Sequence, residues 1–207
     1  MPPVSLATGD VLDAVRDRII LPTLAALADD GNPFRGLLYA GIMLTPDGPS
    51  VIEFNARFGD PETQALLPLL SSSLLEPMLA IASGGSVRGM TLDWLPGAAL
   101  TTVLASAGYP GHYESGHEIH VPADIAAADN VVICHAGTRL SDGRLVTSGG
   151  RVLSVTAVAP DLATAAERSR SAAEAIRFEG KQYRRDIGWR EIARQEQADR
   201  AGVSTSA

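Results

Sequence analysis

A short string in the first third of the chain has the residue types of a metal site. Glu53 and Asn55 lie two positions apart in the otherwise apolar run of residues 51–55. On a β-strand, side chains with this spacing point to the same face, about 6–7 Å apart. We therefore expect their oxygens to reach one cation, with Ile52 and Phe54 facing the core. A carboxylate and an amide oxygen suit Mg²⁺ or Mn²⁺, although the spacing alone is more often an exposed polar face.

The residues directly after this run add one cation and one anion. Arg57 and Asp60 share a segment with Gly59 and Pro61, which predicts a loop. Two charges beside a metal suit the binding of a charged substrate. The simpler alternative is a surface ion pair that only stabilises the loop.

A second candidate for anion binding follows two glycines in the later half. Arg151 stands behind Gly149 and Gly150. Glycines let the backbone approach an anion closely, and a guanidinium binds phosphate as a fork. On the spacing alone, a tight turn with a solvated Arg151 is a more common explanation of this string than an anion site. Arg185 is a weaker candidate, because the pair Arg184–Arg185 is equally typical of a solvated face.

Composition excludes several classes of protein. The 207 residues carry a formal net charge of −7, so no basic excess is available for nucleic acid or an anionic membrane surface. Cys134 is the single cysteine, which rules out an internal disulfide and fits a reducing compartment. No apolar run has the length of a membrane span, and the start lacks the pattern of a signal peptide. We expect a cytoplasmic protein that binds neither nucleic acid nor membranes.

The histidines invite a zinc site, but their spacing argues against one. His112, His117, His120 and His135 lie close together in the sequence, with Cys134 beside the last. His117 and His120 fall on opposite faces of a strand, and no Cys-x-x-Cys or His-x-x-x-His pattern is present. We expect surface or core histidines.

The pattern of residues before position 86 predicts helices around a hairpin. Thr8 or Asp10 is a suitable N-cap, and Pro22 should kink or split the helix that follows. Turn residues between two apolar runs are typical of a β-hairpin. The expected elements are a helix that stops at Gly31, hairpin strands within residues 36–45 and 50–55, and helical stretches over residues 63–82.

A boundary between two parts is expected within residues 86–96, which lack a clear period. Beyond it, short β-like runs separated by turns predict a mostly antiparallel sheet, followed by one amphipathic helix. The chain is therefore expected to be α+β. The predicted strands cover residues 98–107, 118–121, 130–135, 144–147 and 151–159, the helix covers 161–178, and the charged end from Glu191 should fray.

Six strings along the chain, in order and spacing, resemble phosphoribosylamine–glycine ligases, a family of ATP-grasp enzymes. They are LYAG at 38–41, VIEFNARFGDPETQ at 51–64, GYPG at 108–111, HAGT at 135–138, TSGGRVL at 147–153 and DIGWR at 186–190. The resemblance runs from about residue 8 to residue 192. It implies that residues 1–90 are the C-terminal part of an ATP-grasp domain, a hairpin plus helices that carries the metal-binding strand. Residues 91–192 would then be the C-terminal ligase domain, and 193–207 a frayed tail.

The resemblance also implies a reaction. Such ligases use ATP to join glycine to 5-phosphoribosylamine through glycyl phosphate, giving glycinamide ribonucleotide, ADP and phosphate. A metal that bridges the nucleotide phosphates draws charge from the transition state. Carried onto this sequence, the metal ligands are Glu53 and Asn55, the catalytic and substrate-loop residues are Arg57 and Asp60, and further substrate-binding residues are Gly150, Arg151 and Arg185.

The resemblance covers only the later half of such a ligase. The family's phosphate-contacting lysine and glycine-rich lid have no counterpart here, and Lys181 is the only lysine. We therefore expect the chain to be inactive alone, as a catalytic half that is either a piece of a longer ligase or one product of a split gene, which works with a separate N-terminal half. The alternative is a non-catalytic remnant that binds metal, phosphate or a partner. Another ATP-grasp ligase of purine synthesis is disfavoured by the string RFGDPE at 57–62.

Overall fold

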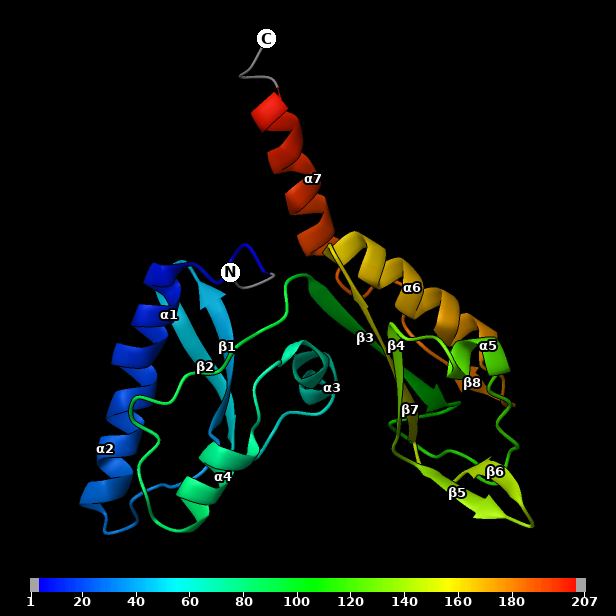
Figure 1. The fold of residues 1–207 in the computed structure, drawn as a ribbon, viewed down its shortest axis with the longest axis horizontal. Coiled ribbons are helices and arrows are strands. Elements are labelled where there is room, and N and C mark those ends of the chain that lie inside the picture. Colours follow the sequence, from blue (N-terminus) through cyan, green and yellow to red (C-terminus); the bar gives the residue numbers. More distant parts are fainter. Residues whose placement is uncertain (1–3, 204–207) are drawn as a thin grey trace. The chain divides into compact units, whose positions relative to one another are not determined.

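The computed structural model describes residues 4–203, and these form two compact units (Figure 1). The first unit contains the described residues up to Gly59 together with Ser72–Asp93. The second contains Asp60–Ser71 and the chain from Trp94 onward. The chain thus passes to the second unit, returns to the first, and enters the second again near residue 94. Residues 60–71 thus belong with the later compact unit, while the expected domain over residues 1–90 stays a prediction.

The first unit begins with a helical stretch that is divided where Pro22 predicts. It consists of α1 (Gly9–Val15), the π-helical turn η1 (Arg16–Ile20) and α2 (Leu21–Asp29). Thr8 is the N-cap, and its hydroxyl accepts a hydrogen bond from the Val11 N–H. Pro22 has no N–H to donate to the preceding turn, so a wider turn there fits its position. The N-cap and the division of the helix are both confirmed.

The expected hairpin is present as β1 (Tyr39–Thr45) and β2 (Gly48–Asn55), paired antiparallel. The Thr45 hydroxyl closes the turn by donating to the Gly48 carbonyl at 2.8 Å. The expectation that Ile52 and Phe54 face a core is wrong for this unit, since they are 63 % and 38 % exposed. A two-stranded hairpin with helical cover on one side cannot bury both faces.

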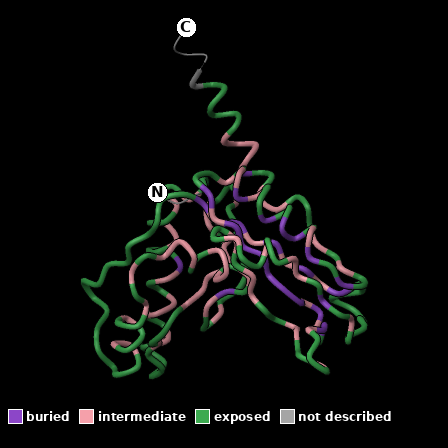
Figure 2. The backbone as a smooth tube through the Cα atoms, turned by 45° about the vertical axis from the view of Figure 1, so that its right-hand side comes forward, coloured by how far each residue is buried: buried purple, intermediate pink, exposed green. Residues whose placement is uncertain are grey.

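The remainder of the first unit is similarly open. Helix α4 (Leu75–Ala82) leaves Leu75 and Leu79 largely exposed, and residues 83–93 have no helix or strand. Ile19 is the one buried apolar side chain among the described residues of this unit. Figure 2 shows the contrast in burial along the backbone.

The second unit is built on a four-stranded antiparallel sheet with the order β4-β7-β3-β8. Helix α6 (Leu162–Ala175) packs against β3 and β7. Leu104, Leu153 and Ile176 are fully buried in the core that results. The strands are β3 (Ala98–Ser106), β4 (Val131–His135), β7 (Arg151–Ala159) and β8 (Lys181–Gln182).

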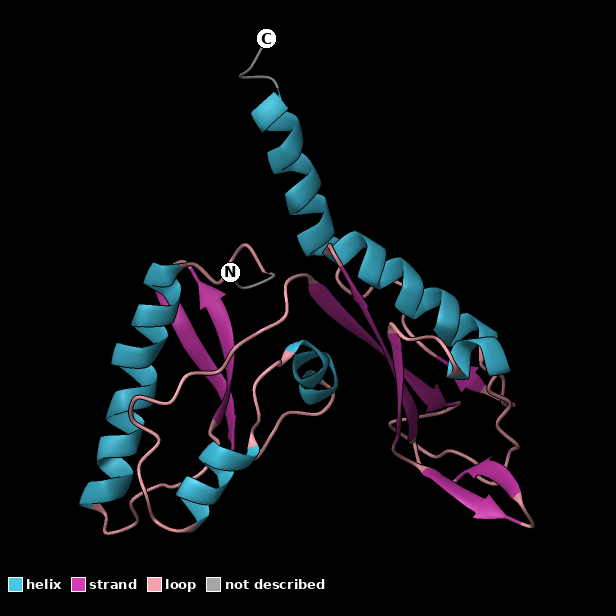
Figure 3. Cartoon of the chain, in the orientation of Figure 1, coloured by secondary structure: helices cyan, strands magenta, loops and turns pink. Residues whose placement is uncertain are grey.

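Smaller elements complete this unit (Figure 3). A second hairpin forms from β5 (Thr138–Ser141) and β6 (Arg144–Thr147). The strand expected at residues 118–121 is reduced to single bridges from Glu118 to Val146 and from His120 to Arg177. The short helical elements are α3 (Glu62–Leu66), the 3-10 turn η2 (Leu67–Leu69) and α5 (Ala123–Ala126).

The charged end expected to fray is instead helical. Helix α7 runs over Trp189–Val203, and residues 204–207 of the expected tail lie outside the described part. The segment is rich in Ala, Arg, Gln and Glu, which have high helix propensity. An ion pair from Arg194 to Glu191 at 2.9 Å adds local support. No helix within residues 4–203 is both long and apolar enough to cross a membrane.

Candidate functional site

The two expected metal ligands lie on one face of β2. The Asn55 side-chain amide donates to Glu53 Oε1 at 3.0 Å, so the two polar groups are in direct contact. Gly41 is paired with Glu53 across the hairpin, and a Cβ at Gly41 would lie 3.2 Å from Glu53 Cγ. The glycine therefore leaves room for the Glu53 side chain to lie across β1.

The donor set of this pair fits part of a magnesium shell. Mg²⁺ is usually held by one or two carboxylates, with substrate phosphates and water as its other ligands. Glu53 supplies one carboxylate, and rotation of the Asn55 amide by 180° presents its oxygen on the same side. Within residues 4–203, no group of three or more His, Cys, Asp or Glu side chains is arranged to hold a metal. Protein ligands alone thus form an incomplete shell.

The two charged residues after β2 do not pair with each other. The Arg57 guanidinium donates to the Phe58 carbonyl at 2.8 Å and belongs to the first unit. Asp60 belongs to the second unit, where it pairs with Arg151. The alternative of an Arg57–Asp60 surface pair is therefore wrong.

Arg151 is held by Asp60 at two points. One guanidinium nitrogen lies 2.9 Å from Asp60 Oδ2, and the other donates to the Asp60 main-chain carbonyl at 3.1 Å. Two contacts fix both the position and the plane of a guanidinium. The pair joins residues 91 positions apart in the sequence.

Asp60 is in turn held by Gln64 on α3. The Gln64 amide donates to Asp60 Oδ1 at 3.0 Å. Gln64 Oε1 is buried and has no hydrogen-bond partner among the described residues. The order of contacts is thus Gln64 to Asp60 to Arg151, with both carboxylate oxygens of Asp60 occupied.

Arg151 opens onto a cavity of about 860 Å³ within the second unit. The lining contains four cationic side chains, two tyrosines and no carboxylate. Such a lining favours an anionic ligand. The charged and aromatic lining residues are Tyr109, Arg151, Lys181, Tyr183, Arg184 and Arg185.

The arginines of the cavity also have carboxylate partners outside its lining. Arg185 lies 3.2 Å from Glu174, and its guanidinium stands over the Tyr183 ring at 5.5 Å. Arg184 lies 2.8 Å from Asp186, and this pair raises the pKa of Arg184 and lowers that of Asp186. These pairs are exposed and contribute little to stability, so a phosphate can compete for the guanidinium groups.

Lys181 has a structural partner that sequence reasoning missed. Its ammonium donates to the carbonyls of Ala173 at 2.8 Å and Glu174 at 3.0 Å, and also to that of Ile176. These are unpaired carbonyls at the C-terminal end of α6, where a cation is favourable. Burial lowers the pKa of Lys181. The ammonium is thereby committed to the helix end.

Gly150 lies directly against the ring of Tyr109. A Cβ there would lie 2.2 Å from Cδ2 of Tyr109, so the ring occupies the space that a side chain would need. The glycine makes room for an aromatic ring at the cavity, and its close approach to an anion stays a prediction. Neither Tyr109 nor Gln64 was a candidate from spacing, although both lie within the strings GYPG and VIEFNARFGDPETQ.

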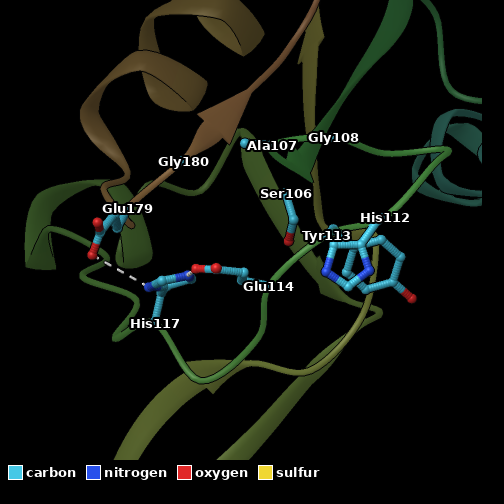
Figure 4. A pocket seen from close by; sticks show the side chains of 9 residues that line it. All are labelled: Ser106, Ala107, Gly108, His112, Tyr113, Glu114, His117, Glu179 and Gly180. Atoms are coloured by element: carbon cyan, nitrogen blue, oxygen red, sulfur yellow. Dashed lines mark ion pairs between the residues drawn. The ribbon is translucent and has the colours of Figure 1, made fainter.

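Two of the four histidines, His112 and His117, line a second cavity of about 490 Å³ (Figure 4). His117 lies between two carboxylates, with Nδ1 at 3.3 Å from Glu179 and Nε2 at 3.7 Å from Glu114. His112 and Tyr113 also line this cavity. The pairs link the loop before His117 to the turn after α6.

Comparison with known proteins identifies the class. Residues 1–63 match the ATP-grasp (A) domain of phosphoribosylglycinamide synthetase, and residues 99–190 match its C domain. The biotin carboxylase domain of Hydrogenobacter thermophilus 2-oxoglutarate carboxylase shares the fold, with a TM-score of 0.57 at 19% identity, over 88% of this chain and 39% of that one. The chain thus belongs to the ATP-grasp class.

Relatives at higher identity define the family. Phosphoribosylamine–glycine ligase of Chlorobaculum tepidum is 47% identical over 186 residues, which cover 90% of this chain and 44% of that protein. The structure of the Thermotoga maritima enzyme of the same name matches with a TM-score of 0.70 at 35% identity, over 86% of this chain and 42% of that one. The chain belongs to the phosphoribosylglycinamide synthetase family and corresponds to its C-terminal half. It spans less than half the length of these relatives.

Proposed function

We propose that this chain supplies the metal-binding strand and the sugar-phosphate site of a phosphoribosylamine–glycine ligase. The observation that carries the proposal is the doubly held Arg151 at a cavity lined by four cations, inside the match to the C domain. In this reaction, ATP activates the glycine carboxylate as glycyl phosphate, and the amine of 5-phosphoribosylamine displaces phosphate. Glycinamide ribonucleotide, ADP and phosphate are the products.

The cavity residues act on the sugar phosphate. Arg151 and Arg185 bind the phosphate of 5-phosphoribosylamine as forks, which orients its amine for attack. Asp60 holds Arg151 in place through its carboxylate and its carbonyl. Gly150 leaves space for the Tyr109 wall. Arg57 and Asp60 are each proposed as catalytic and substrate-loop residues.

Glu53 and Asn55 are the proposed ligands of the metal, Mg²⁺ or Mn²⁺, that accompanies ATP. The bound metal would neutralise charge on the nucleotide phosphates. Glu53 supplies the carboxylate, and the contact with Asn55 keeps the two side chains on one face. The remaining ligands would be phosphate oxygens and water.

The rest of the ligase is the proposed partner of the first unit. The relatives contain more than twice the matched length, and the first unit leaves Ile52, Met43 and Leu79 more than half exposed. Binding of a partner that removes this apolar surface from water would be favourable. A separate N-terminal half is therefore the proposed partner, and a non-catalytic remnant is the alternative.

Reconstitution tests this proposal. Residues 1–207 are assayed for ADP release that depends on both glycine and 5-phosphoribosylamine, with and without the N-terminal half of the C. tepidum ligase. We expect no turnover by the chain alone and activity on addition of the other half. Turnover by the chain alone would show that its nucleotide site is complete, whereas inactivity of the mixture with proven association would favour the remnant.

Two variants of the active mixture assign the site. Glu53→Ala should reduce turnover by about a hundredfold or more through weaker binding of metal and nucleotide, while Ser50→Ala on the same strand should not. Arg151→Ala should raise the KM for 5-phosphoribosylamine more than that for ATP, with Arg139→Ala as its control. Unchanged Mg²⁺ dependence in Glu53→Ala, or equal KM changes in Arg151→Ala, would contradict the respective role.

A further inference from the structure

The wall of the cationic cavity contains an aromatic ring that the proposed chemistry does not use. Tyr109 follows the end of β3 and lines the cavity with Arg151. The residue is 40 % exposed, so part of the ring remains accessible. The neighbouring Tyr113 ring is tilted by 59° at a centroid distance of 6.4 Å, which excludes parallel stacking between the two.

One side of the Tyr109 ring is seated on backbone without a side chain. A Cβ at Gly150 would meet Cδ2, Cε2 and Cγ at 2.2, 2.8 and 3.1 Å. Three ring atoms within this range show that the ring lies against the glycine. The backbone of Gly150 is buried, and its carbonyl accepts a hydrogen bond from the Ser106 N–H at 2.8 Å. The ring therefore rests on backbone that is buried and hydrogen-bonded.

The seat also ties the ring to the guanidinium. Gly150 directly precedes Arg151, which is held at two points by Asp60. The aromatic ring rests on Gly150, and the fork of N–H donors belongs to the next residue in the chain, so the two groups line one cavity. Asp60 contacts the guanidinium and Gly150 contacts the ring, so both groups are partly ordered before a ligand arrives, which reduces the entropy lost on binding.

We propose that Tyr109 is a specificity-determining residue, whose ring packs against the ring of a phosphorylated sugar while Arg151 binds its phosphate. This inference rests on the proposed function of the cavity. A free phosphate needs only the guanidinium and gains nothing from the tyrosine. A ligand with a ring attached to its phosphate gains apolar contact with the aromatic face. Tyr109 therefore raises the affinity of the cavity for a sugar phosphate relative to inorganic phosphate and other small anions.

The test compares two probes on the 207-residue chain itself. Binding of inorganic phosphate and of ribose 5-phosphate is measured by isothermal titration calorimetry for the parent chain, Tyr109→Ala, Tyr109→Phe and Arg151→Ala. Tyr109→Ala should weaken ribose 5-phosphate by about three- to tenfold and leave inorganic phosphate unchanged. Tyr109→Phe should retain the affinity for both, and Arg151→Ala should weaken both.

A further variant, at Gly150, displaces the same ring by changing the residue that it packs against. Gly150→Ala places a methyl group where the ring lies, so it should reproduce the selective loss of Tyr109→Ala. Circular dichroism and the midpoint of thermal unfolding show whether each variant remains folded. If Gly150→Ala fails to fold, Tyr109→Ala still decides the question.

The outcomes separate this inference from the function on which it rests. Equal loss of both probes in Tyr109→Ala, or loss of neither, would overturn the role of Tyr109 while phosphate binding that depends on Arg151 still supports the cavity. Binding of neither probe by the parent chain would instead overturn the cavity as a phosphate site. The same result would remove the inference drawn from it.

Discussion

Both units of this chain contain apolar residues in their helices and strands, but the two units bury these residues to very different extents. In the second unit, every second residue of β3 is buried, most residues of β7 are buried, and α6 packs against both strands. In the first unit, Ile19 alone is buried among the described apolar residues. The difference lies in the number of packed layers. A two-stranded hairpin with a few helices is too small to bury the apolar side chains on both of its faces.

This contrast indicates where each unit obtains its stability. The second unit has its own core and the attributes of a domain that folds by itself. The first unit has correct local structure, including a capped helix and a closed turn, but its apolar face is open. Local signals thus specify elements, whereas stability depends on cover from elsewhere.

The largest expected effect is on hydrogen exchange. Amides in the β3–β7 ladder should exchange on the order of a thousandfold more slowly than those in the β1–β2 ladder, because opening the former requires unfolding of a packed core. Exchange of the chain alone is measured by mass spectrometry of peptides covering each ladder. Similar protection in both ladders would break the contrast between the units.

A matched pair of core deletions should give the next largest effect. Leu104→Ala removes a fully buried side chain of the second unit and should cost about 2–5 kcal/mol of unfolding free energy. Ile52→Ala, at a position 63 % exposed, should change it by less than about 0.5 kcal/mol. Urea unfolding followed by tryptophan fluorescence reports the second unit, since Trp94 and Trp189 both belong to it.

Circular dichroism provides the control for this pair, because it detects both units. Non-coincident transitions by the two probes would sharpen the comparison by showing separate unfolding. A cost for Ile52→Ala as large as that for Leu104→Ala would show that the hairpin face is packed in solution, contrary to the structure.

Much of the fold was accessible from local patterns. Thr8, Pro22 and the turn before Gly48 were sufficient to predict the first helices and the hairpin, and the β-like run of residues 151–159 predicted β7. Strand β8 was missed because two residues become a strand only through pairing with β3. Such pairing is non-local and has no signal in a short window.

The candidate site also has features that were predictable from local sequence and features that were not. The i, i+2 spacing of Glu53 and Asn55 was enough to predict a shared face, because strand geometry is local. The contact between Asp60 and Arg151 was not predictable from spacing, since it depends on the segment 60–71 packing with the second unit. The contact between Gly150 and the Tyr109 ring was likewise not predictable from spacing, because the two residues are distant in sequence.

A smaller effect is expected at the start of α6. Asp161 accepts hydrogen bonds from the Thr164 N–H and hydroxyl, both at 2.8 Å, and these hold its pKa below the usual 3.8. A carboxyl with a lowered pKa contributes stability above its unfolded pKa and loses it as the pH falls through the folded value. Asp161→Ala should lower the unfolding midpoint of the second unit near neutral pH by less than Leu104→Ala does.

Asp161→Asn is the control for this cap, since it keeps an acceptor without a titrating group. Its difference from the parent chain should shrink as the pH is lowered from about 5 to about 2. Thermal unfolding followed by tryptophan fluorescence across this interval measures the difference. A difference that is independent of pH would contradict the assignment of the stabilisation to the ionised carboxylate.

The smallest expected effect concerns the pair that holds residues 60–71 to the second unit. Asp60 and Arg151 are joined at 2.9 Å, but their side chains are 43 % and 40 % exposed, so solvent screens the interaction. A double-mutant cycle with Asp60→Asn and Arg151→Gln should therefore give a coupling of only about 0.5–1 kcal/mol in urea unfolding, decreasing with added salt. The same cycle on Arg184 and Asp186, which are more exposed at 71 % and 53 %, should give a coupling near zero. Coupling at Asp60–Arg151 no larger than at this reference pair would mean that α3 and η2, not the ion pair, keep the segment in the second unit, and that Arg151 is free to move toward a ligand.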